Sequence, residues 1–201
     1  MNEAILRRRV KAVAGGGDGP IVGPEPYLCQ RNNCTLNTNI ADYQDLEFEI
    51  KFILFNNARK NLIYSAYNSN VVELVNQSDG TCTYKDYHFV VNEPYVLAKK
   101  IIKGGSYDLD YYYVNGAKIS TGYTHTEIGT GTIKLSYHIY NWRSFNGGIA
   151  YLKLWHNGEL IFDGVPKEVD GVCGLWDNIT GQLFTNSNPD YPNDRYTIEY
   201  L

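Results

Sequence analysis

Cysteine is sparse in this sequence, and long apolar runs are missing. Four cysteines in 201 residues do not make the dense framework of a small disulfide-rich secreted scaffold. We therefore interpret Cys29, Cys34, Cys82 and Cys173 as reduced, mostly structural thiols. Since no apolar run approaches the roughly 18 residues of a membrane-spanning helix, the sequence predicts a soluble globular protein with no membrane partner.

A strong net charge is also absent. The chain has 18 Lys and Arg against 22 Asp and Glu, for a net charge of −4, and this balance argues against nucleic acid as a partner. The basic residues are unevenly placed, because residues 1–17 hold four of them against one acidic residue. The sequence thus predicts a short basic arm in front of an acidic body.

Residues 1–26 are expected to be a basic arm with a Gly/Pro linker, and residues 27–201 a single folded domain. The arm has too short an apolar stretch for a secretory signal. It spaces apolar residues as a helix would, but an isolated helix of this length is marginal in water. Two alternatives remain, a solvated tail and a segment that docks on a partner. The docking residues would be Ile5, Leu6, Arg7, Arg8, Arg9, Val10, Lys11 and Val13.

From Tyr27 onward the apolar residues repeat every second position, which is typical of half-buried strands. In Asp45–Phe55 the apolar residues fall on one face and the charged ones on the other. The same alternation predicts strands at 132–140 and 107–114. Further strands are expected at 62–67, 71–75, 88–91, 118–121, 149–156, 159–163, 172–176, 182–185 and 196–200.

Two Asn-Gly pairs mark hairpin tips between these strands. Asn115-Gly116 and Asn157-Gly158 each suit a two-residue type I′ turn, because both residues tolerate a positive φ. A third, longer connection is expected over 178–181. About ten to twelve short antiparallel strands, several with one polar face, predict an all-β fold of two sheets packed face to face.

The motifs between Gly148 and Asp177 are the most specific part of the chain. They are Leu152-Lys153-Leu154-Trp155, Asn157-Gly158, Val165-Pro166 and the run from Asp170 to Asp177. In this order they resemble the closing strands of laminin-G-like, concanavalin A-like jelly-roll domains, which occur in phage virion proteins and in surface proteins of gut bacteria. That family has a Val-Pro corner between the hairpin and a strand ending in Gly-Leu-aromatic-Asp. The resemblance is looser over 27–55, where Asn37-Thr38-Asn39-Ile40 takes the place of a short Asp-Thr-Gly-Ile motif.

The resemblance implies a two-sheet antiparallel jelly-roll sandwich with a short N-terminal arm. The arm itself is similar to the leader on structural proteins of phages of gut bacteria. These likenesses imply a non-enzymatic virion protein, such as a capsid decoration, head fibre or tail fibre component, that binds other virion proteins through its arm. A homo-oligomer is one alternative for its assembly state.

A carbohydrate-binding module that recognises a host surface glycan is the second hypothesis. The 18 Tyr and 3 Trp supply flat apolar faces on which sugar rings can stack. Tyr111, Tyr112 and Tyr113 cannot all point inward, so either Tyr112 or the other two must be displayed. Tyr140 and Trp142 precede a glycine turn that would present them. The alternative for each is an ordinary place in the core or in a protein interface.

A glycanase is the third hypothesis, because Asp45, Glu47 and Glu49 share one strand face. Jelly-roll glycanases carry a Glu-x-Asp-x-x-Glu pattern that this strand lacks, and positions i and i+2 lie roughly 7 Å apart at the backbone, against about 5 to 5.5 Å between the carboxyl groups of a retaining pair. We therefore expect a solvated strand face and no enzyme activity.

Cofactor and metal sites find little support. The cysteines lack a second ligand pair at zinc-finger spacing, and no phosphate-binding loop or Gly-x-Ser-x-Gly motif occurs. Laminin-G-like domains often bind calcium at a sheet rim. Asp108, Asp110, Asp163 and Asp177 are candidates on that resemblance, but they do not form an Asp-rich loop, so we predict no metal and no cofactor.

Overall fold

The computed structural model describes residues 24–30, 34–41, 43, 45–58, 60–64, 72–104, 108–123, 131–135, 145–188 and 190–201. In these residues the chain forms sixteen strands and no helix. The strands are β1 Pro26–Gln30, β2 Leu36–Ala41, β3 Leu46–Leu54, β4 Lys60–Tyr64, β5 Val72–Asn76, β6 Cys82–Tyr84, β7 Tyr87–Phe89, β8 Pro94–Ile102, β9 Leu109–Val114, β10 Ala117–Tyr123, β11 Thr132–Leu135, β12 Gly147–His156, β13 Glu159–Val169, β14 Val172–Asp177, β15 Gln182–Phe184 and β16 Thr197–Tyr200.

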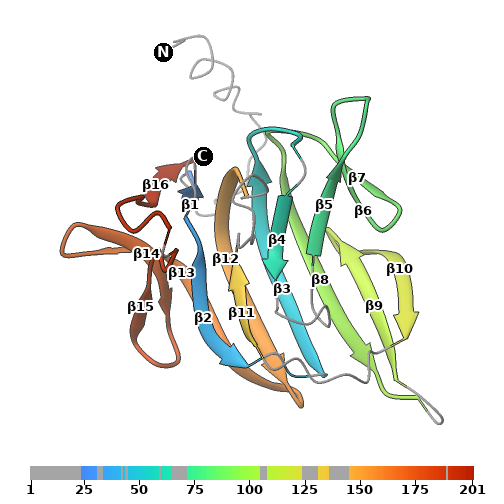
Figure 1. Ribbon diagram of the computed structural model, residues 1–201. Helices are drawn as coiled ribbons and strands as arrows, with labels where there is room; N and C mark the ends of the chain where they lie inside the picture. Colours follow the sequence, from blue (N-terminus) through green and yellow to red (C-terminus); the bar gives the residue numbers. More distant parts are fainter. Residues whose placement is uncertain are drawn as a thin grey trace, which may run out of the picture.

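The strands form two antiparallel sheets that pack face to face (Figure 1). The large sheet has the order β10-β9-β8-β3-β12-β13-β14-β15, and the small sheet has the order β2-β11-β4-β5-β6-β7. The large sheet forks at β12. The edge of β12 that does not pair with β3 pairs with β13 over one half of its length and with β1 over the other half. Strand β16 then pairs with the outer edge of β1. The predicted fold class, a two-sheet jelly-roll sandwich, is confirmed.

Strand β3 shows why these residues make a sandwich. Phe48, Ile50 and Phe52 face the small sheet and are fully buried. Glu47, Glu49 and Lys51 alternate with them and lie on the opposite side, which we call the outer face of the large sheet. Full burial of each large apolar side chain stabilises the folded state by about 1.5–3 kcal/mol. The predicted one-sided pattern of this strand is confirmed.

Three hairpins of the large sheet close with two residues at positive φ. The predicted Asn115-Gly116 and Asn157-Gly158 turns have φ of 49° and 81°, and of 51° and 78°. Asp170-Gly171 forms a third such turn, with φ of 52° and 78°, which the sequence analysis did not identify. These turns fix the register of the strands on either side.

The Val165-Pro166 pair lies inside a strand, and the corner expected there is absent. Strand β13 pairs with β12 as far as Gly164 and with β14 from Gly164 to Val169. Pro166 therefore lies beyond the part of β13 that pairs with β12. Because no β12 residue pairs with it, the N–H that proline lacks costs no hydrogen bond to β12. The expected corner is a change of partner within one continuous strand.

The remaining predictions have mixed outcomes. Within the described residues no cysteine forms a disulfide, and three of the four are buried, which suits structural thiols. The docking residues predicted between Ile5 and Val13 lie outside the described residues, as does most of the linker. Within the described part of the chain, no helix has the length and apolarity needed to cross a membrane.

Candidate functional site

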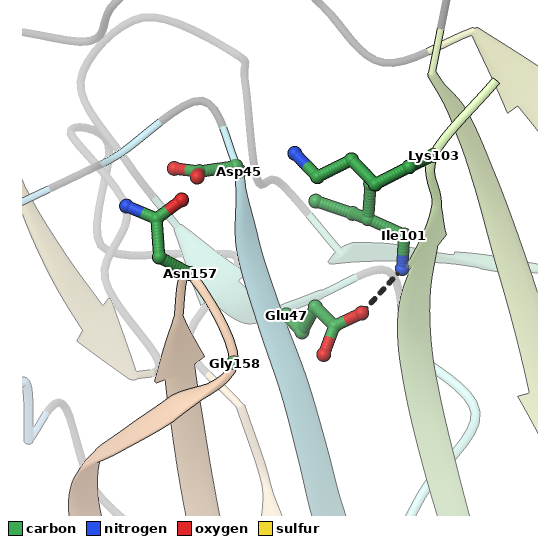
Figure 2. Close-up of a pocket in the computed structure, with 6 residues that line it drawn as sticks. All are labelled: Asp45, Glu47, Ile101, Lys103, Asn157 and Gly158. Carbon is green, nitrogen blue, oxygen red and sulfur yellow. Dashed lines mark hydrogen bonds between the residues drawn. The ribbon is translucent and has the colours of Figure 1, made fainter. Parts of the chain in front are cut away.

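A pocket of about 310 Å³ opens where three elements of the large sheet meet (Figure 2). We call it the end pocket. Asp45 directly precedes β3 and Glu47 lies at its start. Ile101 lies at the end of β8 and Lys103 follows that strand, while Asn157-Gly158 is the β12–β13 turn. Its volume lies at the lower end of the range for small-ligand sites, roughly 300–1,000 Å³.

Hydrogen bonds hold the acidic side chains of the end pocket in place. Glu47 Oε1 accepts a bond of 2.6 Å from the Ile101 N–H. Asp45 Oδ1 lies 2.9 Å from His156 Nε2, and the Tyr43 ring stacks on the His156 imidazole at 3.9 Å. The second oxygen of each carboxylate has no protein donor among the described residues. The pocket thus presents oriented acceptors beside the Asn157 amide and the Lys103 ammonium group, as Figure 2 shows.

A second pocket of about 250 Å³ lies on the same outer face, further along β3 and β8. We call it the side pocket. Ala98 pairs in register with Glu49 on one side and with Tyr113 on the other, so a small side chain stands between two large ones. Glu49 accepts a hydrogen bond of 2.9 Å from the Tyr151 hydroxyl. Burial, followed by this contact with Glu49, raises the pKa of Tyr151 and keeps it a donor.

Aromatic rings on the outer face carry lysine ammonium groups above them. Lys100 Nζ lies 4.3 Å from the centre of the Trp155 ring, and Lys118 Nζ lies 4.7 Å from that of Tyr111. Lys153 Nζ lies 5.6 Å from the centre of the Tyr151 ring, and Lys167 Nζ lies 3.5 Å from the centre of the Trp176 ring. The face therefore combines half-buried rings, ammonium donors and carboxylate acceptors.

Comparison with known proteins supports the architecture. No family model matches the sequence, and no curated protein matches it. A protein from Bacteroides ovatus, proposed to bind carbohydrate, superposes with a TM-score of 0.61 at 10% identity, over 90% of this chain and 61% of that one. The heptameric SAP-like pentraxin of Limulus polyphemus superposes with a TM-score of 0.44 at 11% identity, over 66% of this chain and 76% of that one.

The first likeness is one of fold. This chain spans about three fifths of the length of the Bacteroides ovatus protein. The jelly-roll sandwich expected from the motifs between Gly148 and Asp177 is confirmed as a fold, and the virion setting stays a prediction.

The predicted glycan-binding residues divide between the two faces of β9. Tyr112 points into the core, where it is 8% exposed and meets the Tyr84 ring edge-on at 5.7 Å. Burial, and then the charge of Asp110, raises its pKa to about 12. Tyr111 and Tyr113 lie on the outer face, and Tyr113 lines the side pocket. Of the two arrangements left open by the sequence, the displayed pair is the one observed. Tyr140 and Trp142 lie outside the described residues.

The three carboxylates considered for glycan hydrolysis are separated by their surroundings. Asp45 and Glu47 line the end pocket, whereas Glu49 lines the side pocket. Each already contacts a neighbouring protein group: the His156 ring, the Ile101 N–H or the Tyr151 hydroxyl. The three carboxylates therefore lie in two different pockets, each beside a different protein group.

The aspartates considered as calcium ligands have other roles. Asp108 pairs with Lys103 at 3.1 Å, and Asp110 is buried beside Lys99. Asp177 accepts hydrogen bonds from the N–H groups of Ile179 and Thr180 and so shapes the β14–β15 turn. Within the described ranges, no group of three or more His, Cys, Asp or Glu side chains is placed to hold a metal ion.

Four residues of the site were not assigned to it from the sequence. Lys100 belongs to the end of β8 and Lys103 follows it directly, and the sequence pattern did not predict this strand. Trp155 and Asn157 were noticed as motif and turn residues, without a role in binding. The spacing of Trp155 and Asn157 was the signal available in the sequence. Residues two positions apart on a strand point to the same face, so the tryptophan and the turn asparagine belong to the same side of the sheet.

Proposed function

We propose that this domain is a non-enzymatic carbohydrate-binding module whose site is the end pocket and the adjoining outer face of the large sheet. The observation that carries the proposal is the end pocket itself. Carboxylate oxygens of Asp45 and Glu47, the Asn157 amide and the Lys103 ammonium group converge on it, and Trp155 is the register partner of Glu47 on the neighbouring strand. Sugar hydroxyls donate and accept hydrogen bonds, and sugar ring faces stack on aromatic side chains.

The position of Trp155 relative to the pocket strengthens this proposal. Trp155 pairs in register with Glu47, which lines the pocket, and precedes the Asn157-Gly158 turn by two residues. A pyranose ring on this part of the sheet would meet an aromatic side chain and polar groups at once. The fold shared with the Bacteroides ovatus protein, which is proposed to bind carbohydrate, agrees with such a role.

The test is binding of the full chain to a glycan panel, followed by titration of each bound glycan into the variant Asn157→Gly. Glycine keeps the positive φ of 51° that this turn position requires, while the side-chain amide is removed. We expect binding to weaken about tenfold, or about 1.4 kcal/mol, with little change in Tm.

Asp170→Gly is the matched control, because Asp170 has a φ of 52° in an equivalent turn and lines neither pocket. It should bind glycan as the unmodified chain does. A folded protein that binds nothing on a broad panel would contradict the proposal, as would equal losses in the two variants. The virion location stays a prediction that rests on the sequence motifs.

A further inference from the structure

The lysines of the outer face divide into two groups. Lys51, Lys103 and Lys153 each have a carboxylate partner. Lys100, Lys118 and Lys167 lie over aromatic rings, as Lys153 also does, but they form no ion pair with any residue in the described part of the chain. Their charges are therefore available to a ligand.

Lys100 is the member of the second group that belongs to the candidate site. Its side chain lines the side pocket, and its ammonium group covers the Trp155 ring, whose register partner Glu47 lines the end pocket. A sugar that stacks on this face of Trp155 must displace Lys100 from the ring, so the ligand has to compensate for a lost cation–π contact.

The nearby carboxylates form no ion pair with Lys100. Glu47 and Glu49 flank the lysine on β3, yet neither lies within ion-pair distance of it, since Glu47 accepts from the Ile101 N–H and Glu49 from the Tyr151 hydroxyl. A neutral sugar would give the displaced ammonium group no charged partner of its own. A negatively charged sugar would give it a charge-assisted hydrogen bond, which is about twice as strong as a neutral one.

We propose that the glycan bound here is acidic, and that its carboxylate or sulfate group pairs with Lys100 while its ring takes the place of the ammonium group on Trp155. This inference rests on the proposed function, because it names the class of glycan for the same site. Uronic acids and sulfate esters share the required charge, so the experiment includes both.

The experiment is calorimetric titration of the full chain with oligogalacturonate, a chondroitin sulfate oligosaccharide and neutral cellohexaose. We expect an acidic glycan to bind at least tenfold more tightly than the neutral one. Lys100→Gln should remove most of this preference, and Lys100→Arg, which keeps the charge, should retain it. The two acidic ligands show whether carboxylate or sulfate is preferred.

Lys167→Gln is the matched control, because it removes the same charge from the same kind of contact outside both pockets. Equal losses in Lys167→Gln and Lys100→Gln would overturn the inference, since general charge attraction would then explain the binding. Equal binding of neutral and acidic glycans, unaffected by Lys100→Gln, would also overturn it and leave the proposed function standing. The absence of binding to any glycan would contradict both.

Discussion

Lys99 and Asp110 form an ion pair in the interior of the sandwich. The two groups lie 3.4 Å apart and are 1% and 2% exposed. Tyr112, the register partner of Lys99 on β9, points into the same core. Burying two charges costs several kcal/mol per ion, which their mutual attraction largely offsets when the contact is intact. Removing one member of this pair therefore destabilises the fold, because the charge of the other member stays buried without this contact.

Lys99→Met is expected to lower the free energy of unfolding by about 3–5 kcal/mol, because the buried Asp110 carboxylate would lose its contact with the Lys99 ammonium group. Chemical denaturation followed by tryptophan fluorescence measures the change. Lys118→Met, on the outer face, is the control and should cost less than about 1 kcal/mol. A similar small loss for Lys99→Met would show that the pair contributes little.

The candidate site could be anticipated only in part at this scale. The sequence predicts that some of Tyr111, Tyr112 and Tyr113 must be displayed, because neighbouring residues of a strand point to opposite faces. Trp155 and Lys100 lie 55 positions apart in the sequence, and their contact depends on the order in which β8, β3 and β12 pair. No local pattern encodes that order.

Strand β14 passes so close to β15 that Gly174 has no space for a side chain. A Cβ atom at Gly174 would lie 2.2 Å from the carbonyl oxygen of Phe184. The obstacle is backbone, which cannot rotate away as a flexible side chain would. This contact fixes the edge of the large sheet beside the Asp177 turn.

Gly174→Ala is expected to destabilise the domain by about 2–3 kcal/mol, because the strands must separate to admit the methyl group. Thermal unfolding followed by circular dichroism is the measurement. Gly122→Ala on β10 is the matched control, since a Cβ there meets no atom within 4 Å. Equal shifts in Tm for the two variants would contradict the role given to the close approach.

Whether an element could be predicted depended on how plainly its burial pattern appears in its sequence. Strand β3 alternates apolar and charged residues, and its face was assigned correctly. Strand β8 was missed, because Lys99 and Lys100 are adjacent and look like a solvated pair, although Lys99 is buried by its partner on β9. Whether such a lysine is buried depends on a charged partner from a distant part of the chain, and a single sequence does not show which residues pair.

Buried tyrosines make the stability of the whole molecule sensitive to alkaline pH. Burial is the main cause that raises the pKa of Tyr112 to about 12 and those of Tyr84 and Tyr196 well above their ordinary value. In the unfolded chain these groups ionise near pH 10. The folded state therefore holds more protons above that pH, so stability is full below pH 10 and falls as pH rises toward 12 and beyond.

Each of these tyrosines should lower the free energy of unfolding by up to about 1.4 kcal/mol per pH unit above pH 10. Denaturation curves at pH 9, 10 and 11 test this, and Tyr112→Phe should make the decline shallower. Tyr200→Phe is the control, because Tyr200 is 67% exposed and does not belong to the core. An unchanged slope in Tyr112→Phe would contradict the assignment.

The fork of the large sheet bears on how the chain folds as it is synthesised. Strand β1 pairs with β12 and with β16, so Leu28 lies opposite Ile149 on one side and Ile198 on the other. Neither partner is close in sequence, and contacts between distant segments form slowly. Strand β1 is the first described strand to be synthesised. Its second edge can form hydrogen bonds only after β16, which ends at Tyr200, has been made. We expect folding to reach completion only after synthesis of the domain ends.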